Sequence, residues 1–494
     1  MNTDNTKVGH SSRKRGEPHK HAVGKSAPKP ETKARHKAKS RNHGNKRTKA
    51  ATRAPTHEKS SKYQWLNQKY GRLRARDWLF IGGLALAALC VGGWFLVRRE
   101  VPDFRPAHQF AVRDPFFFSA AHAAADPVPV EGNRITLLHN GKGTFPQILQ
   151  SIAGSKATIN FEAFIFNSGQ VGDQFIEALV ARARAGVEVR ILLDGIGSGL
   201  SLKNSDVRRL EEGGCTFAYY HPTRAFRLDR LNRRTHRRVI VIDGRVGFTG
   251  GIGFSDEWQG NADSPDHWRD LHAKVEGPVV AKLQAAFQQH WFAATGEMLA
   301  TPSHFPLVET AGKLRAQVIT STEFSLAALP LMQAVAIASA EKTIDITNPY
   351  CTPTEGHVYL LNEAVKRGVR VRMLLPGKHN DQPWTKAAGR TCYGELLKGG
   401  VQIFEYTPTM IHSKTMVVDG LFSILGTSNL DARSAAINEE IDLTVYDQDF
   451  AKQMEGIFED DMKHTSPYTL ESFERRGLWE RFSEWIVLPF QSQL

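Results

Sequence analysis

The sequence predicts an α/β protein made of two pseudo-twofold-related halves that share one active site at their interface. Two stretches, HRRVIVIDG at His236–Gly244 and HSKTMVVDG at His412–Gly420, repeat one pattern of histidine, cation and Asp-Gly. The segments upstream of both stretches alternate strand and helix patterns in the same order, which favours a parallel or mixed sheet in each half. A basic tail and an uncharged run precede the halves, so a disordered tail and a single transmembrane helix complete the prediction.

Each repeat reads as a strand that returns through a tight hairpin. The residues between the histidine and the Asp-Gly pair are mostly β-branched or apolar, which suits a buried strand. Asp-Gly followed by apolar residues is a strong hairpin signal. If Asp-Gly fills both turn positions, His236 lies opposite Gly251 and His412 lies opposite Thr427. The returning strands then bring glycines and Asn429 beside the histidines.

The duplication sets the predicted domain boundaries. In both halves a strand is followed by a helix that ends at a glycine, Gly186 or Gly368, and then by a strand, a helix, a Gly-Gly pair, a strand and the motif hairpin. The predicted segments are a basic cytoplasmic tail at 1–76, a transmembrane helix at 77–98, a linker at 99–132, a first half at 133–305 and a second half at 306–494.

Paired histidines with adjacent cations indicate phosphoryl-type transfer. A neutral imidazole is a good nucleophile toward phosphorus, and an imidazolium can protonate an alkoxide leaving group. Cations and an amide beside them hold the non-bridging phosphate oxygens and stabilise charge in the transition state. This chemistry requires no metal and no cofactor. The sequence contains no P-loop, dinucleotide-binding glycine pattern, HExxH motif or paired CxxC motifs.

The distribution of charge argues against nucleic acid as the partner of the folded part. The chain has a net charge of +13, but residues 1–76 hold 22 Lys and Arg against 4 Asp and Glu. The tail therefore carries +18 and the remainder of the chain −5. A tail so poor in apolar residues cannot fold alone, and it would attract anionic lipid headgroups or nucleic acid.

Twenty uncharged residues, Trp78–Val97, predict a single membrane span. At 1.5 Å per residue such a helix is about 30 Å long, the thickness of the hydrocarbon core of a bilayer. The preceding flank carries more Lys and Arg than the following one, which favours a cytoplasmic tail and an outward-facing catalytic domain. Phenylalanines of the linker (Phe104, Phe110, Phe116–Phe118) and apolar residues at helical spacing in the C-terminus (Leu478, Phe482, Trp485, Ile486) are expected to pack against the domain, with lipid contact as the alternative.

The motifs resemble those of the phospholipase D superfamily and, within it, of the bacterial cardiolipin synthases. The resemblance covers Asn133 to the C-terminus. It rests on HSKTMVVD with GTSNLDARSAAINEE in the second half, and on NRRTHRRVIVIDGRVGFTGGIGFSDEW with HWRDLHAKVEGP in the first. It implies the phospholipase D-like fold and transfer of a phosphatidyl group between two phosphatidylglycerols through a phosphatidyl-histidine, with release of glycerol. It also implies a phospholipid substrate and the bacterial inner membrane, where the charge bias around the span favours the outer (periplasmic) face for the catalytic domain.

The resemblance also assigns roles to individual residues. His236 and His412 become nucleophile and general acid, an assignment that stays open with a preference for His236 as the nucleophile. Lys414 and Asn429 hold phosphate, and Asp270 and Glu440 orient the histidines. The catalytic set is completed by Arg238, Asp243 and Asp419, the last as a structural carboxylate.

The first half departs from the family pattern at two positions. Arg238 stands where lysine is expected, and Gly253 stands where the phosphate-holding asparagine is expected. Either the site works asymmetrically or the first half has lost catalytic strength. A lipid hydrolase with the same intermediate, a nuclease, and a catalytically weak scaffold that binds membrane or nucleic acid remain alternatives. The acyl preference, the donor and acceptor lipids and the oligomeric state are left open.

Overall fold

The computed structural model describes residues 75–96, 103–124, 128–222, 232–322 and 327–493. The first half contains strands β1 (Val130–His139), β2 (Thr158–Ala163), β3 (Glu188–Asp194), β4 (Thr216–Tyr220), β5 (Val239–Ile242), β6 (Val246–Gly250) and β7 (Leu271–Glu276). Its helices are α4 (Asn140–Ala153), α5 (Gln170–Arg184), α6 (Asn204–Glu212), η1 (Asp256–Trp258) and α8 (Val280–Thr295).

The second half repeats this series and extends it. Its strands are β8 (Leu314–Thr320), β9 (Thr343–Thr347), β10 (Arg370–Pro376), β11 (Gln402–Tyr406), β12 (Thr415–Val418), β13 (Phe422–Gly426), β14 (Ile441–Tyr446) and β15 (Thr465–Tyr468). Its helices are α9 (Ala328–Ala338), α10 (Glu355–Lys366), α11 (Pro383–Lys398), α12 (Ala432–Ala436), α13 (Gln448–Met462), α14 (Leu470–Glu474), α15 (Leu478–Val487) and η2 (Leu488–Gln493). Helices α2 (Ala75–Leu96) and α3 (Pro115–Ala124) precede both halves.

Within the described residues, fifteen strands form one mixed sheet in the order β15-β11-β10-β9-β12-β13-β14-β8-β1-β7-β6-β5-β2-β3-β4. Outward from the β1–β8 pair, the order β1-β7-β6-β5-β2-β3-β4 matches β8-β14-β13-β12-β9-β10-β11 strand for strand. In each half the last three of these strands are parallel to one another. The repeated α/β topology that the sequence predicts is thus present, and an irregular antiparallel pairing of β1 with β8 joins the two halves of this sheet.

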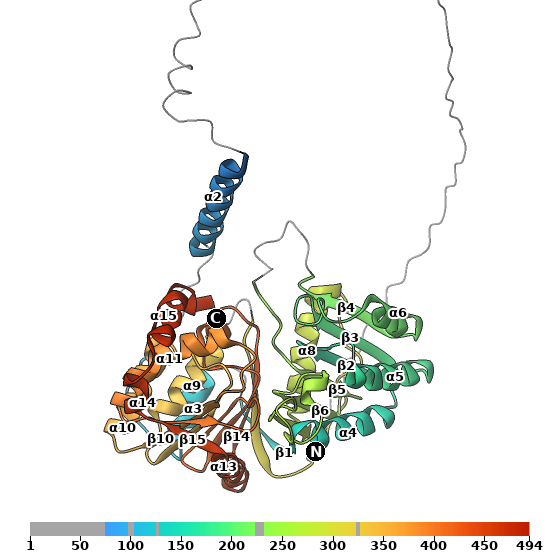
Figure 1. The fold of residues 1–494 in the computed structure, drawn as a ribbon. Coiled ribbons are helices and arrows are strands. Elements are labelled where there is room, and N and C mark those ends of the chain that lie inside the picture. Colours follow the sequence, from blue (N-terminus) through green and yellow to red (C-terminus); the bar gives the residue numbers. More distant parts are fainter. Residues whose placement is uncertain (1–74, 97–102, 125–127, 223–231, 323–326, 494) are drawn as a thin grey trace, which may run out of the picture. The chain divides into compact units, whose positions relative to one another are not determined.

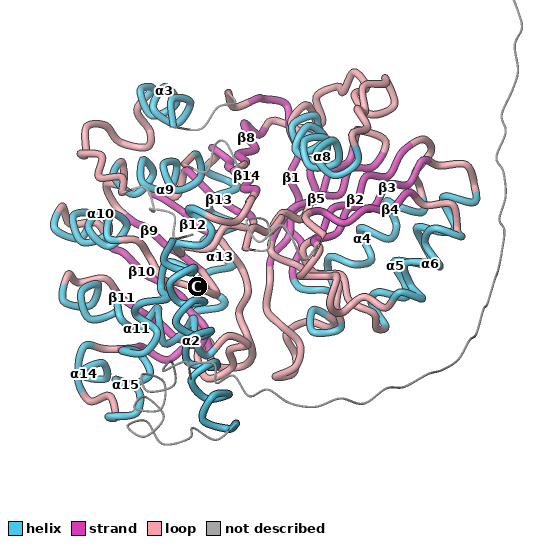
Figure 2. The backbone as a smooth tube through the Cα atoms, turned by 90° about the horizontal axis from the view of Figure 1, so that it is seen from above, coloured by secondary structure: helices cyan, strands magenta, loops and turns pink. Residues whose placement is uncertain are grey.

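In the described part of the chain, three large hydrophobic cores and a small fourth one hold the layers together (Figures 1 and 2). Helices α4, α5 and α6 cover one face of the first half's strands. Helices α3, α9, α10 and α11 pack in the corresponding core of the second half. The third core combines residues of α8 and α13 with strands from both halves, so it fixes the halves against each other.

The predicted hairpin register is wrong by one residue. Asp243 and Gly244 form the turn with positive φ values of 53° and 62°, and the Arg245 N–H donates to the Ile242 carbonyl at 3.0 Å. The ladder then pairs Ile242 with Val246, so Arg245 is an extra residue on the returning strand. The second hairpin has the same one-residue shift. The shift arises because the Arg245 N–H closes the turn, so the pairing between the two strands begins one residue later, at Val246.

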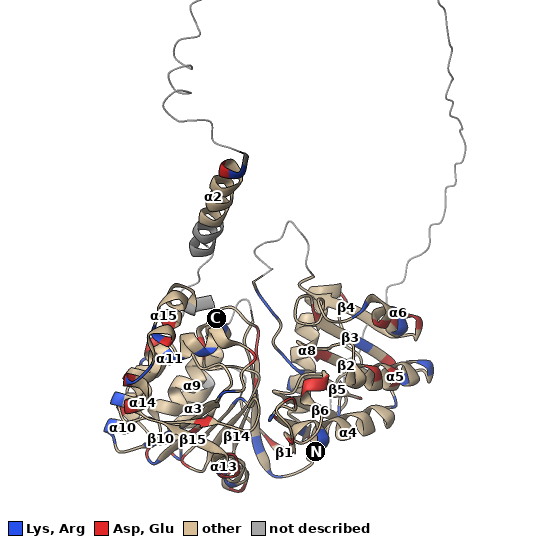
Figure 3. Ribbon diagram, in the orientation of Figure 1, with Lys and Arg blue, Asp and Glu red and all other residues tan. Residues whose placement is uncertain are grey.

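Helix α2 covers most of the uncharged run of the sequence. The charged residues in the described part of this helix, Arg76 and Asp77, lie in its first turn (Figure 3). Among the described helices, none meets the length and hydropathy expected of a membrane-crossing segment. The predicted tail lies outside the described residues except for Ala75 and Arg76.

The expected packing of the flanking aromatic residues is confirmed in part. Phe104, Phe110 and Phe117 contact the core of the second half, whereas Phe116 is exposed. The expectation for the C-terminus is wrong: Leu478, Phe482, Trp485 and Ile486 are all exposed on α15.

Candidate active site

The backbone of each motif histidine is held by the opposite half. The His236 N–H donates to the Glu439 carbonyl at 2.9 Å, and the Glu439 N–H donates to the Arg234 carbonyl at 2.9 Å. In the second half the His412 N–H donates to the Arg269 carbonyl at 2.7 Å. Each histidine therefore has a fixed position only when both halves are folded and joined.

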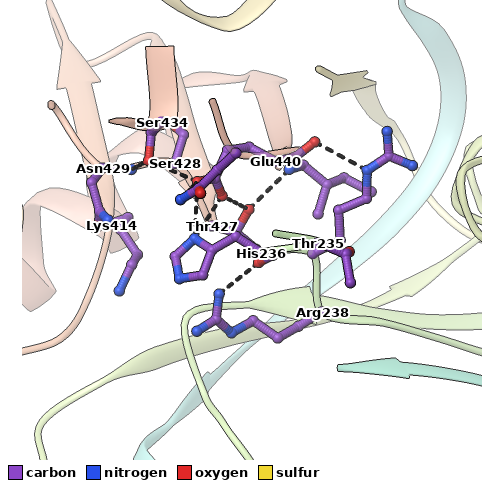
Figure 4. Close-up of polar contacts among 12 residues, drawn as sticks. Thr235, His236, Arg238, Lys414, Thr427, Ser428, Asn429, Ser434 and Glu440 are labelled. Carbon is purple, nitrogen blue, oxygen red and sulfur yellow. Dashed lines mark hydrogen bonds and ion pairs between the residues drawn. The ribbon is translucent and has the colours of Figure 1, made fainter. Parts of the chain in front are cut away.

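The carboxylate partners of the imidazoles also cross between the halves. His236 Nδ1 lies 2.8 Å from Glu440 Oε2, and His412 Nδ1 lies 2.8 Å from Asp270 Oδ2. Figure 4 shows His236 next to Glu440. A carboxylate at Nδ1 fixes the ring orientation and keeps the proton on that nitrogen. Both Nε2 atoms are then left with their lone pairs.

Burial keeps the two imidazoles neutral and their partners ionised. Burial lowers the pKa of His236 to about 4, with a further contribution from Arg238. Burial and the charge of Lys414 lower the pKa of His412 to about 3. Burial opposes ionisation of Asp270, but His412 and Lys414 outweigh it and lower the pKa of this carboxyl to about 2. The pKa of Glu440 is lowered, despite its burial, by His236 and by hydrogen bonds. Neutral imidazole is the nucleophilic form.

A cation from each half lies beside the histidine of its own motif. Lys414 Nζ is 2.7 Å from the His412 carbonyl oxygen and 2.9 Å from His412 Nε2. Arg238 Nη1 donates to the His236 carbonyl at 2.6 Å. Burial lowers the pKa of Lys414 to about 7, despite the nearby carboxylate of Asp270. The two cations thus occupy equivalent places in the two motifs, and Figure 4 shows both near the His236 ring.

Three buried polar atoms of pocket-lining residues lack hydrogen-bond partners among the described residues. They are Arg238 Nε, Asn429 Oδ1 and Asn438 Oδ1. An unpaired buried polar group costs free energy, on the order of 1–3 kcal/mol. Such groups are typical of positions where a polar ligand completes the hydrogen bonding.

The two histidines line one pocket of about 390 Å³. Arg238 and Asn429 also line it, so residues from both halves meet at one cavity. The walls include aromatic side chains and two further cations: Phe164, Trp258, Trp268, Tyr350, Arg234 and Arg433. Asp270 and Glu440 are fully buried behind the histidines. The structure therefore brings together seven of the nine residues singled out from the sequence, with Lys414 against the ring of His412.

The structure does not bring Asp243 and Asp419 to this pocket. The Asp243 carboxylate accepts the backbone N–H groups of residues 156, 157 and 158 at 2.7–2.9 Å. The Asp419 carboxylate accepts those of residues 341, 342 and 343 at the same distances. Each aspartate ties its hairpin turn to the start of the neighbouring central strand. These contacts fit the structural role expected of Asp419, and they correct the grouping of Asp243 with the catalytic residues.

Trp258 occupies the space that the missing asparagine leaves in the first half. A Cβ atom at Gly253 would come within 2.9 Å of the Trp258 ring. The two histidine-orienting carboxylates also have different donors. The Trp258 Nε1–H donates to Asp270 Oδ2 at 2.8 Å, whereas the Ser434 hydroxyl donates to Glu440 Oε1 at 2.7 Å. The site is thus asymmetric in both shape and donors.

Sequence reasoning missed several pocket residues. Trp258 lies within a quoted motif and went unassigned. Arg234 and Arg433 lie two residues before His236 and four residues after Asn429, so their proximity to the motifs was a usable signal. Tyr350 and Asp381, which hydrogen-bond to each other at 2.8 Å, gave no comparable signal because their segments carry no recognisable motif.

Comparisons with known proteins decide the family. A family model described as "Cardiolipin synthase, PLD-like domain" matches residues 148–291 and 334–462, one segment in each half. The chain belongs to this family. It is 32% identical over 382 residues to the probable cardiolipin synthase YwiE of Bacillus subtilis, covering 77% of this chain and 76% of that one. It is 34% identical over 356 residues to the cardiolipin synthase of Geobacillus kaustophilus, covering 71% and 70%.

Solved structures support the fold alone. Phosphatidylserine synthase of Haemophilus influenzae Rd KW20 matches with a TM-score of 0.57 at 15% identity, covering 76% of this chain and all of that one. Membership of the cardiolipin synthase family makes the chain an enzyme of the phospholipase D superfamily. The resemblance stated from the motifs is confirmed.

Proposed function

We propose that the chain is a membrane-anchored cardiolipin synthase that joins two phosphatidylglycerols and releases glycerol through a phosphatidyl-histidine. The observation that carries this proposal is the convergence of His236 and His412 on one pocket, each backed by a carboxylate of the other half. Relatives at 32–34% identity bear the name cardiolipin synthase. Arg234 and Arg433 add cations to the same pocket, which suits a reaction between two anionic lipids.

The first step forms the covalent intermediate. Nε2 of the nucleophilic histidine attacks the phosphorus of one phosphatidylglycerol, and the bond from phosphorus to the glycerol headgroup oxygen breaks. The second histidine, which takes up a proton at Nε2 as the anionic substrate binds, gives that proton to the oxygen, and glycerol leaves. Lys414 and Arg238 bear positive charge beside the phosphate oxygens and stabilise the transition state.

In the second step the second histidine acts as a general base, and the acceptor is a second phosphatidylglycerol. The second histidine takes the proton from a glycerol hydroxyl of another phosphatidylglycerol. The deprotonated oxygen attacks phosphorus, the P–N bond breaks, and cardiolipin is released. Lys414 Nζ lies 2.9 Å from His412 Nε2, and its positive charge lowers the pKa of His412, which makes a protonated His412 a stronger acid. This contact favours His412 as general acid and His236 as nucleophile.

Product analysis tests this function. The purified full chain is incubated with phosphatidylglycerol vesicles, and the lipids and the soluble products are identified by mass spectrometry. The proposal expects cardiolipin and free glycerol in equal amounts. Phosphatidic acid as the main product would show a hydrolase instead, and the absence of any product would leave only a binding role.

We also propose that helix α2 anchors the chain, with the tail in the cytoplasm and the catalytic domain on the outer face of the inner membrane. The support is the uncharged run Trp78–Val97, together with the greater number of Lys and Arg on its N-terminal side. Alkaline carbonate extraction removes peripheral proteins from membranes. The anchored chain is expected to stay in the membrane pellet after extraction, and its release into the supernatant would contradict the anchor.

The charge of Lys414 predicts how activity depends on pH. Lysine is charged below its pKa, and the charged form binds the anionic substrate. Because burial lowers this pKa to about 7 in the free enzyme, we expect kcat/KM to fall as the pH rises through about 7. A Lys414→Arg variant keeps its charge, since the pKa of arginine is above about 12.

The alkaline limb of the profile should therefore shift upward by at least about one pH unit in Lys414→Arg. The profile is measured with a short-chain, monomeric phosphatidylglycerol. Lys452→Arg, on the exposed surface of α13, serves as the control and should leave the limb in place. An unshifted limb in Lys414→Arg would show that another group controls it.

A further inference from the structure

Helix α15 carries a continuous apolar face that the folded domain does not cover. Its five members are 39–86% exposed, and we call them the C-terminal apolar face: Leu478, Trp479, Phe482, Trp485 and Ile486. Their spacing of one, three and four residues places them on one side of the helix. The aromatic rings are in contact with one another: the Trp479 and Phe482 centroids are 5.7 Å apart, and those of Phe482 and Trp485 are 6.3 Å apart.

The opposite side of α15 is tied to the domain, so the helix cannot roll to bury this face. Glu484 and Val487 are buried. Glu484 Oε1 lies 3.0 Å from Arg476 Nε, and Glu480 Oε1 lies 2.8 Å from Arg390 Nη1 on α11. An ordinary surface helix turns its apolar side to the core and its charges to water. Helix α15 does the reverse on its largest face, which indicates a partner outside the folded domain.

Helix α11 connects α15 with the reaction pocket, because it packs against α15 and its first residues line the pocket. Helices α11 and α15 pack together, and Figures 1 and 2 both show them side by side. A groove of about 250 Å³ between them is lined by Lys386 and Ser483 among others. At the start of α11, Gln382 and Thr385 line the reaction pocket, and Trp384 between them is 60% exposed. An exposed aromatic side chain, Trp384, thus lies between two pocket-lining residues on the helix that packs against α15.

The kind of side chain and the size of the face both favour a lipid surface over a protein partner. Tryptophan is enriched at the boundary between headgroups and acyl chains, and helices that lie in that boundary carry Trp, Phe and Leu on their apolar face. One face of a ten-residue helix offers on the order of a few hundred Å², less than the about 800 Å² per partner that a stable dimer buries. A lipid surface has no such minimum area, because each inserted side chain contributes separately.

We propose that the C-terminal apolar face docks the catalytic domain on the bilayer that supplies its substrate, with α15 lying in the headgroup region. This inference rests on the proposed function, since it takes the substrate to be a membrane lipid. The docked helix presents the pocket beside α11 to lipid headgroups, so a phosphatidylglycerol can enter without leaving the bilayer completely. The proposed N-terminal anchor holds the chain near the membrane, and the C-terminal apolar face sets the orientation of the domain.

The test compares bilayer substrate with dissolved substrate. The full chain is assayed on vesicles of long-chain phosphatidylglycerol and on short-chain phosphatidylglycerol below its critical micelle concentration. In the double variant Trp479→Ser/Trp485→Ser, the ratio of vesicle rate to monomer rate should fall at least ~10-fold. Turnover of the monomeric substrate should fall far less. Pelleting with vesicles is not the readout, because an anchored chain pellets in either case.

Phe116→Ser/Leu307→Ser is the matched control. Both side chains are exposed, at 70% and 95%, and neither belongs to the C-terminal apolar face. This control should keep the wild-type ratio, and thermal unfolding should give the same midpoint for both double variants and for wild type. An unchanged ratio in the α15 variant would overturn the inference. So would a self-association of wild type, without vesicles, that the α15 variant abolishes, since the occupant would then be a second copy.

The two proposals fail in different ways. If wild type makes no cardiolipin from either substrate, the proposed function fails. If wild type makes cardiolipin from both and the α15 variant matches its control, only the docking surface fails.

Discussion

Replacement of His412 by asparagine is expected to lower turnover by at least about 10⁴-fold. The imidazole of His412 is the only group of this residue that can exchange a proton with the leaving or attacking oxygen, and asparagine cannot do so. The asparagine amide can still donate to Asp270, which lies 2.8 Å from His412 Nδ1. The variant should therefore fold with its buried carboxylate satisfied. Cardiolipin formation is measured by mass spectrometry and folding by thermal unfolding.

The matched comparison is the double variant His236→Asn/His412→Asn. The two histidines act on one phosphorus atom, so removing both should cost about as much as removing either alone. Losses that multiply, or a single variant that keeps substantial activity, would mean that the two halves work as separate sites.

Replacement of Asp419 by alanine is expected to destabilise the second half by about 3 kcal/mol. The carboxylate accepts three backbone N–H groups at 2.7–2.9 Å, and alanine leaves all three without this partner. Alanine is also disfavoured at the φ value of 54° that this position adopts. Thermal unfolding of the full chain measures the loss.

Asp419→Asn is the control for this prediction. Asparagine tolerates positive φ and keeps one acceptor oxygen, so its loss should be clearly smaller. Because Asp419 is not part of the pocket lining, the rate per folded molecule should change much less than in the His412 variant. Equal destabilisation by alanine and asparagine would show that the carboxylate hydrogen bonds contribute little.

Local sequence patterns predicted the repeated half and most of its site. The motif strands at residues 239–242 and 415–418 are buried as their apolar sequences require, and both are followed by Asp-Gly turns with positive φ. The duplication predicted that two histidines meet, and both line one pocket. The hairpin register was missed because an Asp-Gly pair does not specify whether the next N–H closes the turn or begins the ladder.

Contacts between the halves could not be read from either motif alone. Nothing in HSKTMVVDG specifies that Asp270 of the other half accepts from His412, because that pairing depends on how two folded units join. The role of Trp258 is a similar case. Its ring fills the space beside Gly253, and this contact depends on the folded structure rather than on the spacing of the two residues. Periodicity predicted helix α15, but it could not say that ion pairs from Glu480 and Glu484 would hold the polar side inward.

The central claim is that a phosphatidyl group is carried on a histidine of the shared pocket, and trapping that intermediate tests it most directly. The full chain is mixed with phosphatidylglycerol labelled at phosphorus, quenched with denaturant at neutral pH during turnover, digested and analysed by mass spectrometry. The account predicts an acid-labile phosphatidyl adduct on His236 that disappears in His236→Asn. A labelled adduct on any residue other than His236 or His412, or turnover with no adduct on either histidine, would contradict it.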